Sequence, residues 1–220
     1  SKYLKEYNKK FDLDLPHFSS LESQVASFAD DIAYNNHDID DGFRAGFFTI
    51  GQLCELPFVN EVIKEFNRQN PRADDNLRIY AVTRNTIAKM IFDILENSRR
   101  NLEKYNIETA DDVRRQKNFI ITFSDEMHHH IRELRSFLKK YFYTHTNVAR
   151  MDMKSQRIVE ELFEAFMNDS RLLPMPVRSS LPASPSEELL AETICTYIAN
   201  MTDMMAIEEH QKLMDVHTRF

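Results

Sequence analysis

The chain has 220 residues, of which 28 are Lys or Arg and 35 are Asp or Glu, so its formal net charge is −7. This length can bury a sizeable apolar core in one domain or two small ones. Only three glycines are present, too few for a hairpin-rich all-β fold or a Gly-rich phosphate loop. The acidic balance argues against a protein that coats nucleic acid, so we expect no nucleic-acid partner.

The cysteines and the hydropathy pattern predict a soluble cytoplasmic protein. Cys54 and Cys195 lie alone in apolar stretches without CxxC spacing, which favours buried free thiols over a disulfide. No apolar run approaches the ~18 residues needed to cross a bilayer. The polar N-terminus does not resemble a signal peptide, so we expect no membrane partner.

Helix-capping signals and apolar residues at 3–4-residue spacing recur along the chain. The sequence SSLE at 19–22 forms a capping box that opens a helix over about 20–36 with one apolar face. Thr49 opens a second box for a short helix that Pro57 stops. Further helices are expected over about 58–69, 75–105, 124–143 and 148–167, with a short turn capped by Thr109.

The remaining segments favour connectors over strands. Residues 119–123, FIITF, form the one β-like run, and they could equally be a buried connector. Residues 172–185 hold four of the seven prolines and are expected to form a surface loop before the final helices. The last helical stretch is expected to start at Pro185, break near Thr202 and end near Val216.

The most informative segment is ADDIAYNNHDIDDG at 29–42, in which Asp recurs without Lys or Arg. A solvated acidic face is its simplest interpretation. Asp30, Tyr34 and Asp38, however, are spaced i, i+4 and i+8, so a continuous helix places them on one face. Asp30 adjoins the apolar stripe, and a partly buried carboxylate needs a cation or donors to offset its desolvation. A divalent metal is a common solution where Asp and His share a site.

The histidines and glycines around this segment constrain the interpretation. Three consecutive helical side chains point about 100° apart, so the histidines at 128–130 cannot converge on one ion, and surface or packing roles are expected for them. The remaining isolated histidines are expected to be structural. All three glycines follow the acidic segment, where we expect the helix to end and the chain to turn: Gly42, Gly46 and Gly51.

The runs LESQVA at 21–26 and ADDIAYNNHDIDDGFRAG at 29–46 closely resemble the deoxyguanosine-triphosphate triphosphohydrolase-like members of the HD-domain superfamily. The similarity covers nearly the whole chain, continuing through 123–127, 138–145, 171–174, 197–203 and 206–210. It implies an all-α, HD-domain-like multi-helix bundle, of which residues 1–220 are the C-terminal portion. The enzymes of this family are hydrolases that cleave a dNTP into deoxynucleoside and triphosphate, by metal-assisted attack of water on the α-phosphorus.

The resemblance assigns roles to three residues and a catalytic role to none. Asp30 matches the final Asp of the metal-binding His…His-Asp…Asp set, which holds a divalent metal such as Mg²⁺ or Mn²⁺. Tyr34 and Asp38 match residues that hold the sugar of the deoxynucleoside triphosphate. Asp38 is expected to face the 3′-hydroxyl, while Tyr34 leaves no room for a 2′-hydroxyl.

The sequence also departs from the family pattern. The family's first His, its His-Asp dyad and its His/Glu-containing catalytic loop have no counterpart here, because the pair His37-Asp38 falls at the sugar-binding end. Met204 stands where family members usually carry Arg, so an anion contact is expected to be lost. We therefore expect the isolated chain to bind metal weakly or not at all and to be inactive.

Two alternatives stay open. The first is a non-catalytic helical module derived from the same fold and used for oligomerisation or regulation. The family commonly forms hexamers, so a homo-oligomer is expected, and the 10 Met and 16 Phe suit subunit contacts as well as a core. The second is a self-contained metal site made of Asp30, His37, Asp38 and Asp41. Candidate triphosphate contacts are basic: Arg84, Arg99, Arg100, Arg114, Arg115, Arg135, Lys139, Lys140 and Arg150.

Overall fold

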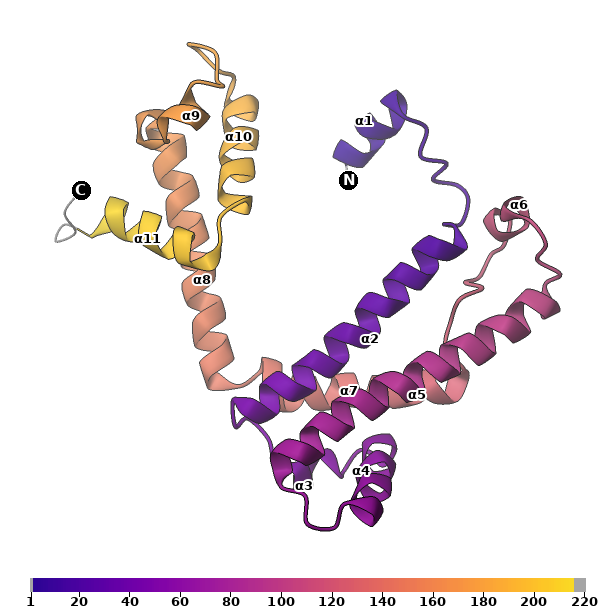
Figure 1. Cartoon of the computed structure of the whole chain (residues 1–220). Helices are drawn as coiled ribbons and strands as arrows, with labels where there is room; N and C mark the ends of the chain where they lie inside the picture. The colour runs from indigo at the N-terminus through magenta and orange to yellow at the C-terminus, as the bar shows by residue number, and fades with distance from the viewer. Residues whose placement is uncertain (1, 216–220) are drawn as a thin grey trace. The chain divides into compact units, whose positions relative to one another are not determined.

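The computed structural model describes residues 2–215. They form two compact units, and the boundary between the units in the sequence lies between His145 and Thr146. Every regular element in the described residues is helical, and no strand occurs among them (Figure 1). The predicted all-α fold is therefore confirmed. No helix of the described part is long and apolar enough to span a bilayer.

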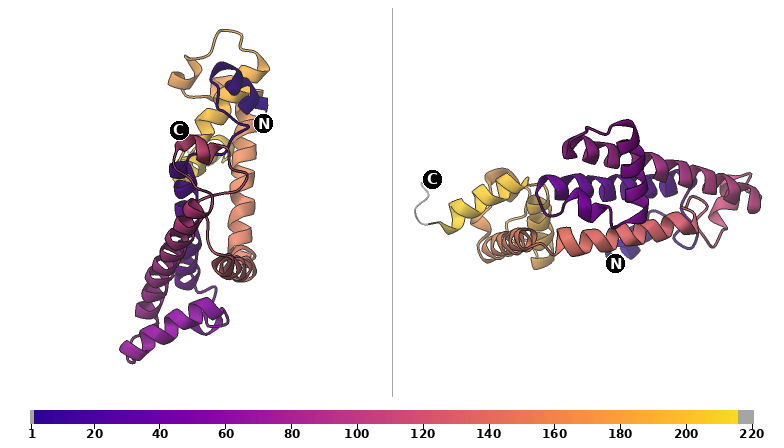
Figure 2. Two further views of the ribbon diagram at one scale, coloured as in Figure 1. Left: turned by 90° about the vertical axis from the view of Figure 1, so that its right-hand side faces the viewer. Right: turned by 90° about the horizontal axis from the view of Figure 1, so that it is seen from below.

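The first unit is built around two long helices, α2 (Leu21–Arg44) and α5 (Asp75–Lys104), which run antiparallel and side by side (Figure 1 and Figure 2). Helix α4 (Pro57–Gln69) packs against α5, and α7 (Asp125–Leu138) packs against α2. The buried core between these helices includes Ile39, Met90 and Leu138, all fully inaccessible to solvent. The other elements are α1 (Lys2–Lys10), α3 (Ile50–Leu53), α6 (Ala110–Arg114) and the π-helical turn η1 (Lys139–Tyr143).

Helix α2 begins where the sequence predicts but ends later. Ser20 caps its first turn by accepting a hydrogen bond from the backbone N–H of Ser23. The helix continues past the predicted end near residue 36 to Arg44, so Gly42 lies inside it and does not end it. Gly46, at a φ of 71°, makes the turn that follows. The long α2 carries the whole acidic segment on one continuous helix.

The β-like run at 119–123 is a connector whose backbone is bound by side-chain amides. Gln24 of α2 is buried and accepts hydrogen bonds from two successive backbone N–H groups of the run, at 3.0 and 3.1 Å. From α5, Asn97 and Asn101 donate to three of its carbonyl oxygens, each at 3.0 Å. Five backbone groups of the run are therefore satisfied without a neighbouring strand.

The second unit consists of helices packed on α8 (Thr146–Asn168). Helices α10 (Glu187–Ala199) and α11 (Asp203–Met214) both contact α8, around a small core that contains Leu162, Phe166, Leu173 and Ile194. The predicted break near Thr202 is confirmed, because Thr202 caps α11. The proline-rich segment 172–185 follows the 3₁₀ turn η2 (Ser170–Leu172) and contains the single-turn helix α9 (Met175–Arg178).

Two sequence predictions about this fold are wrong in detail. Helix α10 starts at Glu187 with Ser186 as its cap, because the Ser186 hydroxyl rather than Pro185 satisfies the first turn. Cys195 is exposed rather than buried, since its neighbour Ile194 occupies the core-facing position of α10. Cys54 is partly buried, and this burial raises the pKa of its thiol.

Candidate functional site

The three predicted site residues lie on successive turns of α2 and differ in exposure. Asp38 is buried, with 8% of its surface exposed, whereas Tyr34 is 57% exposed. Asp30 is also exposed, contrary to the expectation of a partly buried carboxylate. The reason is that no described element of the first unit covers this side of α2 around Asp30. The predicted face is therefore continuous, but it is exposed to solvent at Asp30 and Tyr34 and buried at Asp38.

Tyr143 is a site residue that the sequence reasoning missed. Its hydroxyl donates a hydrogen bond to the carboxylate of Asp38 and interacts with the hydroxyl of Tyr34. Tyr143 is the last residue of η1, and π-helical turns of this kind are frequent at functional sites. The family similarity over 138–145 was the one sequence signal that could have drawn attention to it.

The pKa values of this pair fix which group donates. Burial raises the pKa of Asp38, the hydrogen bond from Tyr143 opposes this rise, and the charge of Asp41 adds to it. Burial and the bond to Asp38 also raise the pKa of Tyr143 far above its usual range. Tyr143 therefore stays protonated as a donor, and the carboxylate of Asp38 keeps lone pairs for a second donor.

Aromatic packing holds η1 against the end of α2. A Cβ atom at Gly42 would overlap the rings of Phe48 and Phe142, so the absence of a side chain lets both rings close over the helix. Phe142 contacts Phe47 at a centroid distance of 5.7 Å, and His145 stacks on Phe47 at 3.9 Å. These contacts position the backbone from which Tyr143 reaches Asp38.

Arg135 brings a cation to the same helix. From α7, its guanidinium lies 3.0 Å from the carboxylate of Asp31 and 3.4 Å from the side-chain oxygen of Asn35. Other predicted phosphate contacts have local partners, since Arg100 pairs with Glu96 on its own helix and Lys140 donates to the neighbouring Tyr141. Among the basic residues predicted to contact the triphosphate, Arg135 is thus one that the fold places against α2.

The consecutive histidines have packing and surface roles, as the sequence predicts. The ring nitrogen Nε2 of His128 is 3.0 Å from the hydroxyl of Thr122. His130 stacks on Phe58 with ring centroids 5.2 Å apart, and His129 lies on the exposed side near Glu133. The three rings therefore serve different neighbours.

A complete metal site is not present in the part of the chain that the structure describes. Across residues 2–215, no three His, Cys, Asp or Glu side chains are grouped so that they could hold an ion. Asp30, His37, Asp38 and Asp41 thus do not form a self-contained site. An exposed carboxylate at Asp30 does not by itself fit a divalent metal, which needs several ligands.

Comparison with known proteins identifies the relatives of this fold. Residues 121–212 match the phosphohydrolase-associated domain that accompanies HD-domain phosphohydrolases. A deoxyguanosinetriphosphate triphosphohydrolase-like protein of Neorickettsia sennetsu is 36% identical over 209 residues, which is 95% of this chain and 54% of that protein. A protein of the same name from Parvibaculum lavamentivorans is 39% identical over 212 residues, 96% of this chain and 53% of that protein.

The chain is a homologue of the deoxyguanosinetriphosphate triphosphohydrolase-like proteins. This finding confirms the resemblance that the sequence analysis placed over nearly the whole chain. The chain spans about half the length of the curated relatives it matches. These relatives are named triphosphohydrolase-like proteins, and the chain is similar to them along almost all of its own length.

Proposed function

We propose that this chain is the sugar-binding portion of a metal-dependent dNTP triphosphohydrolase, inactive by itself. The observation that carries the proposal is the buried carboxylate of Asp38 with Tyr143 as a fixed donor beside it. The carboxylate accepts the hydrogen bond of a sugar 3′-hydroxyl, and the exposed ring of Tyr34 packs below the sugar, where a 2′-hydroxyl would collide with it. Arg135, whose side chain is 52% exposed beside Asp31, is the cation that we assign to the triphosphate.

The metal-binding part of the proposed enzyme is incomplete in this chain. Asp30 supplies one oxygen ligand, and the described residues do not group two further ligands with it. The metal ligands and the attacking water must then depend on residues outside this sequence. For this reason we assign no catalytic residue and expect no turnover by the isolated chain.

The experiment measures inorganic triphosphate released from dGTP with Mg²⁺ or Mn²⁺. The purified chain is compared with a chimera in which the unmatched half of the Neorickettsia sennetsu relative precedes residue 1. We expect release by the chimera alone, loss of release in its Asp30→Ala and Asp38→Ala variants, and little change in the Asp152→Ala variant of α8. Release by the isolated chain, or a folded chimera indifferent to Asp30→Ala, would contradict the proposal.

A non-catalytic helical module remains the second candidate. It is favoured by the lack of any grouped metal ligands among the described residues. A folded but inactive chimera, together with a chain that forms stable homo-oligomers in sedimentation equilibrium, would favour this module. The homo-oligomer, for which a hexamer is one candidate form, and the cytoplasmic location stay predictions.

A further inference from the structure

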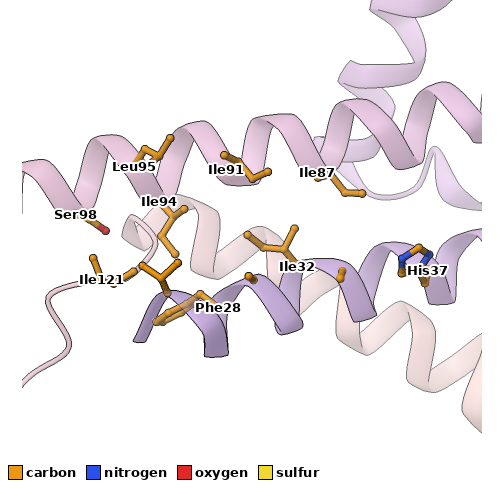
Figure 3. A pocket seen from close by; sticks show the side chains of 12 residues that line it. Phe28, Ile32, His37, Ile87, Ile91, Ile94, Leu95, Ser98 and Ile121 are labelled. Atoms are coloured by element: carbon orange, nitrogen blue, oxygen red, sulfur yellow. The ribbon is translucent and has the colours of Figure 1, made fainter. Parts of the chain in front are cut away.

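An apolar groove runs between α2 and α5 on the side of α2 next to Asp30. Its volume is about 290 Å³. Figure 3 shows apolar side chains of the two helices lining it, with Ser98 toward one end and His37 toward the other. On the α2 side it extends from Val25 to His37, about 18 Å along the helix at 1.5 Å per residue. Val25 and Leu95 line it and are each 50% exposed, so apolar surface is left open to solvent.

Two further features indicate that the groove has an occupant. The hydroxyl of Ser98 is buried within its lining and has no hydrogen-bond partner among the described residues; the residue is only 6% exposed. A buried hydroxyl without a partner costs free energy, so a missing polar partner is expected there. On the opposite wall, the small Ala29 and Ala33 lower the surface of α2 and let another backbone approach closely.

We infer that this groove binds an apolar α-helix. That helix belongs to the half of the longer relatives that this chain does not span. The inference rests on the proposed function, in which that half supplies the ligands that join Asp30. Asp30 directly follows the groove residue Ala29. A helix seated in the groove therefore brings its own side chains beside the exposed carboxylate, and it covers the apolar walls and offers a partner to Ser98.

The charge pattern argues against a second copy of the chain as the occupant. A symmetric contact through the groove would bring the two α2 helices together. Each α2 carries Asp30 directly after the groove residue Ala29, within a chain of net charge −7. Like charges placed across such a contact oppose association. An apolar helix without that acidic face meets no such repulsion.

The experiment is co-expression of the full chain with the unmatched half of the Neorickettsia sennetsu relative, followed by purification through a tag on the chain. We expect a one-to-one complex by light scattering. The variant Ala29→Trp overpacks the groove and should weaken association by about tenfold or more, which corresponds to about 1.4 kcal/mol or more. The matched control Ala149→Trp replaces an exposed alanine of α8 that does not line the groove, so it should bind as the unchanged chain does.

Hydrogen exchange of the unchanged chain, with and without the added half, supplies a readout that does not depend on a variant. Protection gained at 25–37 and 87–98 supports the inference. Absence of a complex, equal binding by both Trp variants, or a groove-dependent dimer of this chain would overturn it. Association is measured without substrate, so a complex that forms through the groove but releases no triphosphate would refute the proposed function and leave the docking inference standing.

Discussion

The hydroxyl of Tyr143 donates a hydrogen bond to the carboxylate of Asp38, across 105 positions of sequence. This bond joins the π-helical turn η1 to α2, and Asp38 is almost fully buried where it forms. The carboxylate of Asp38 thus serves as a structural tie and as the proposed sugar-binding group. Variants of Tyr143 and Asp38 separate the two roles.

Replacing Tyr143 with Phe removes the donor and leaves the ring in place. We expect the free energy of unfolding to fall by about 1–3 kcal/mol at neutral pH, because a buried acceptor loses its partner. Urea unfolding checks this loss. The control Tyr141→Phe removes a hydroxyl that is bonded to the exposed Lys140, and it should change stability much less; equal losses in the two variants would contradict the prediction.

Replacing Asp38 with Asn should change how stability depends on pH. Burial raises the folded-state pKa of Asp38 above its ordinary value of 3.8, so the charged form costs stability at pH values above this folded pKa. The cost vanishes below the unfolded pKa. The stability of the Asp38→Asn variant relative to the unchanged chain should therefore increase as pH rises through this window and then level off.

Unfolding free energies measured from about pH 3 to pH 8 test this sign. The amide oxygen of the variant can still accept the Tyr143 hydrogen bond, so the comparison isolates the charge. Asp111→Asn on the exposed side of α6 serves as the control and should show no such rise. A relative stability that falls with increasing pH would rule out the assigned effect of burial.

Substituting Gly42 with Ala should destabilise the first unit although Ala favours helices. The added Cβ overlaps the rings of Phe48 and Phe142, and overpacking of this kind costs about 1–3 kcal/mol. Thermal unfolding measures the loss, and the near-ultraviolet circular dichroism of the aromatic residues reports the displaced rings. Gly51→Ala meets only an ordinary contact at 3.7 Å and should be neutral or stabilising; a similar result at Gly42 would show that the rings adjust freely.

Replacing Glu161 with Gln should weaken the second unit. The Nε2 atom of His210 in α11 lies 2.5 Å from a carboxylate oxygen of Glu161 in α8. This bond and that from Arg157 hold the pKa of Glu161 below its usual 4.5, so their contribution is present above this value and fades as pH falls through the lowered pKa. Thermal unfolding should show a lower midpoint for Glu161→Gln at neutral pH, whereas exposed Glu164→Gln should not.

The helices could be predicted from the sequence because their caps and apolar spacing are local. The Thr49 capping box and the helix over 75–105 appear where the sequence predicts them. The end of α2 could not be predicted, since Gly42 favours helix termination locally and is kept helical by Phe48 and Phe142 packed over it. Tertiary packing overrides propensity at that position.

The candidate site was partly accessible from sequence. Spacing alone placed Asp30, Tyr34 and Asp38 on one face, and α2 carries all three. The partnership with Tyr143 was not accessible, because it depends on a π-helical turn that has no spacing signature and on a contact between distant elements. The exposure of Asp30 depends on what covers α2, which its own helix does not encode.

The amide-bound connector at 119–123 has a consequence for the behaviour of the chain in concentrated solution. Its sequence, FIITF, is the segment of this chain best suited to cross-β stacking, since it is uncharged, β-prone and free of Pro and Gly. Gln24, Asn97 and Asn101 occupy backbone donors and acceptors that a neighbouring chain would need. The three amides thus oppose the pairing of this segment with a strand of another chain. They come from two helices that are distant from the segment in sequence.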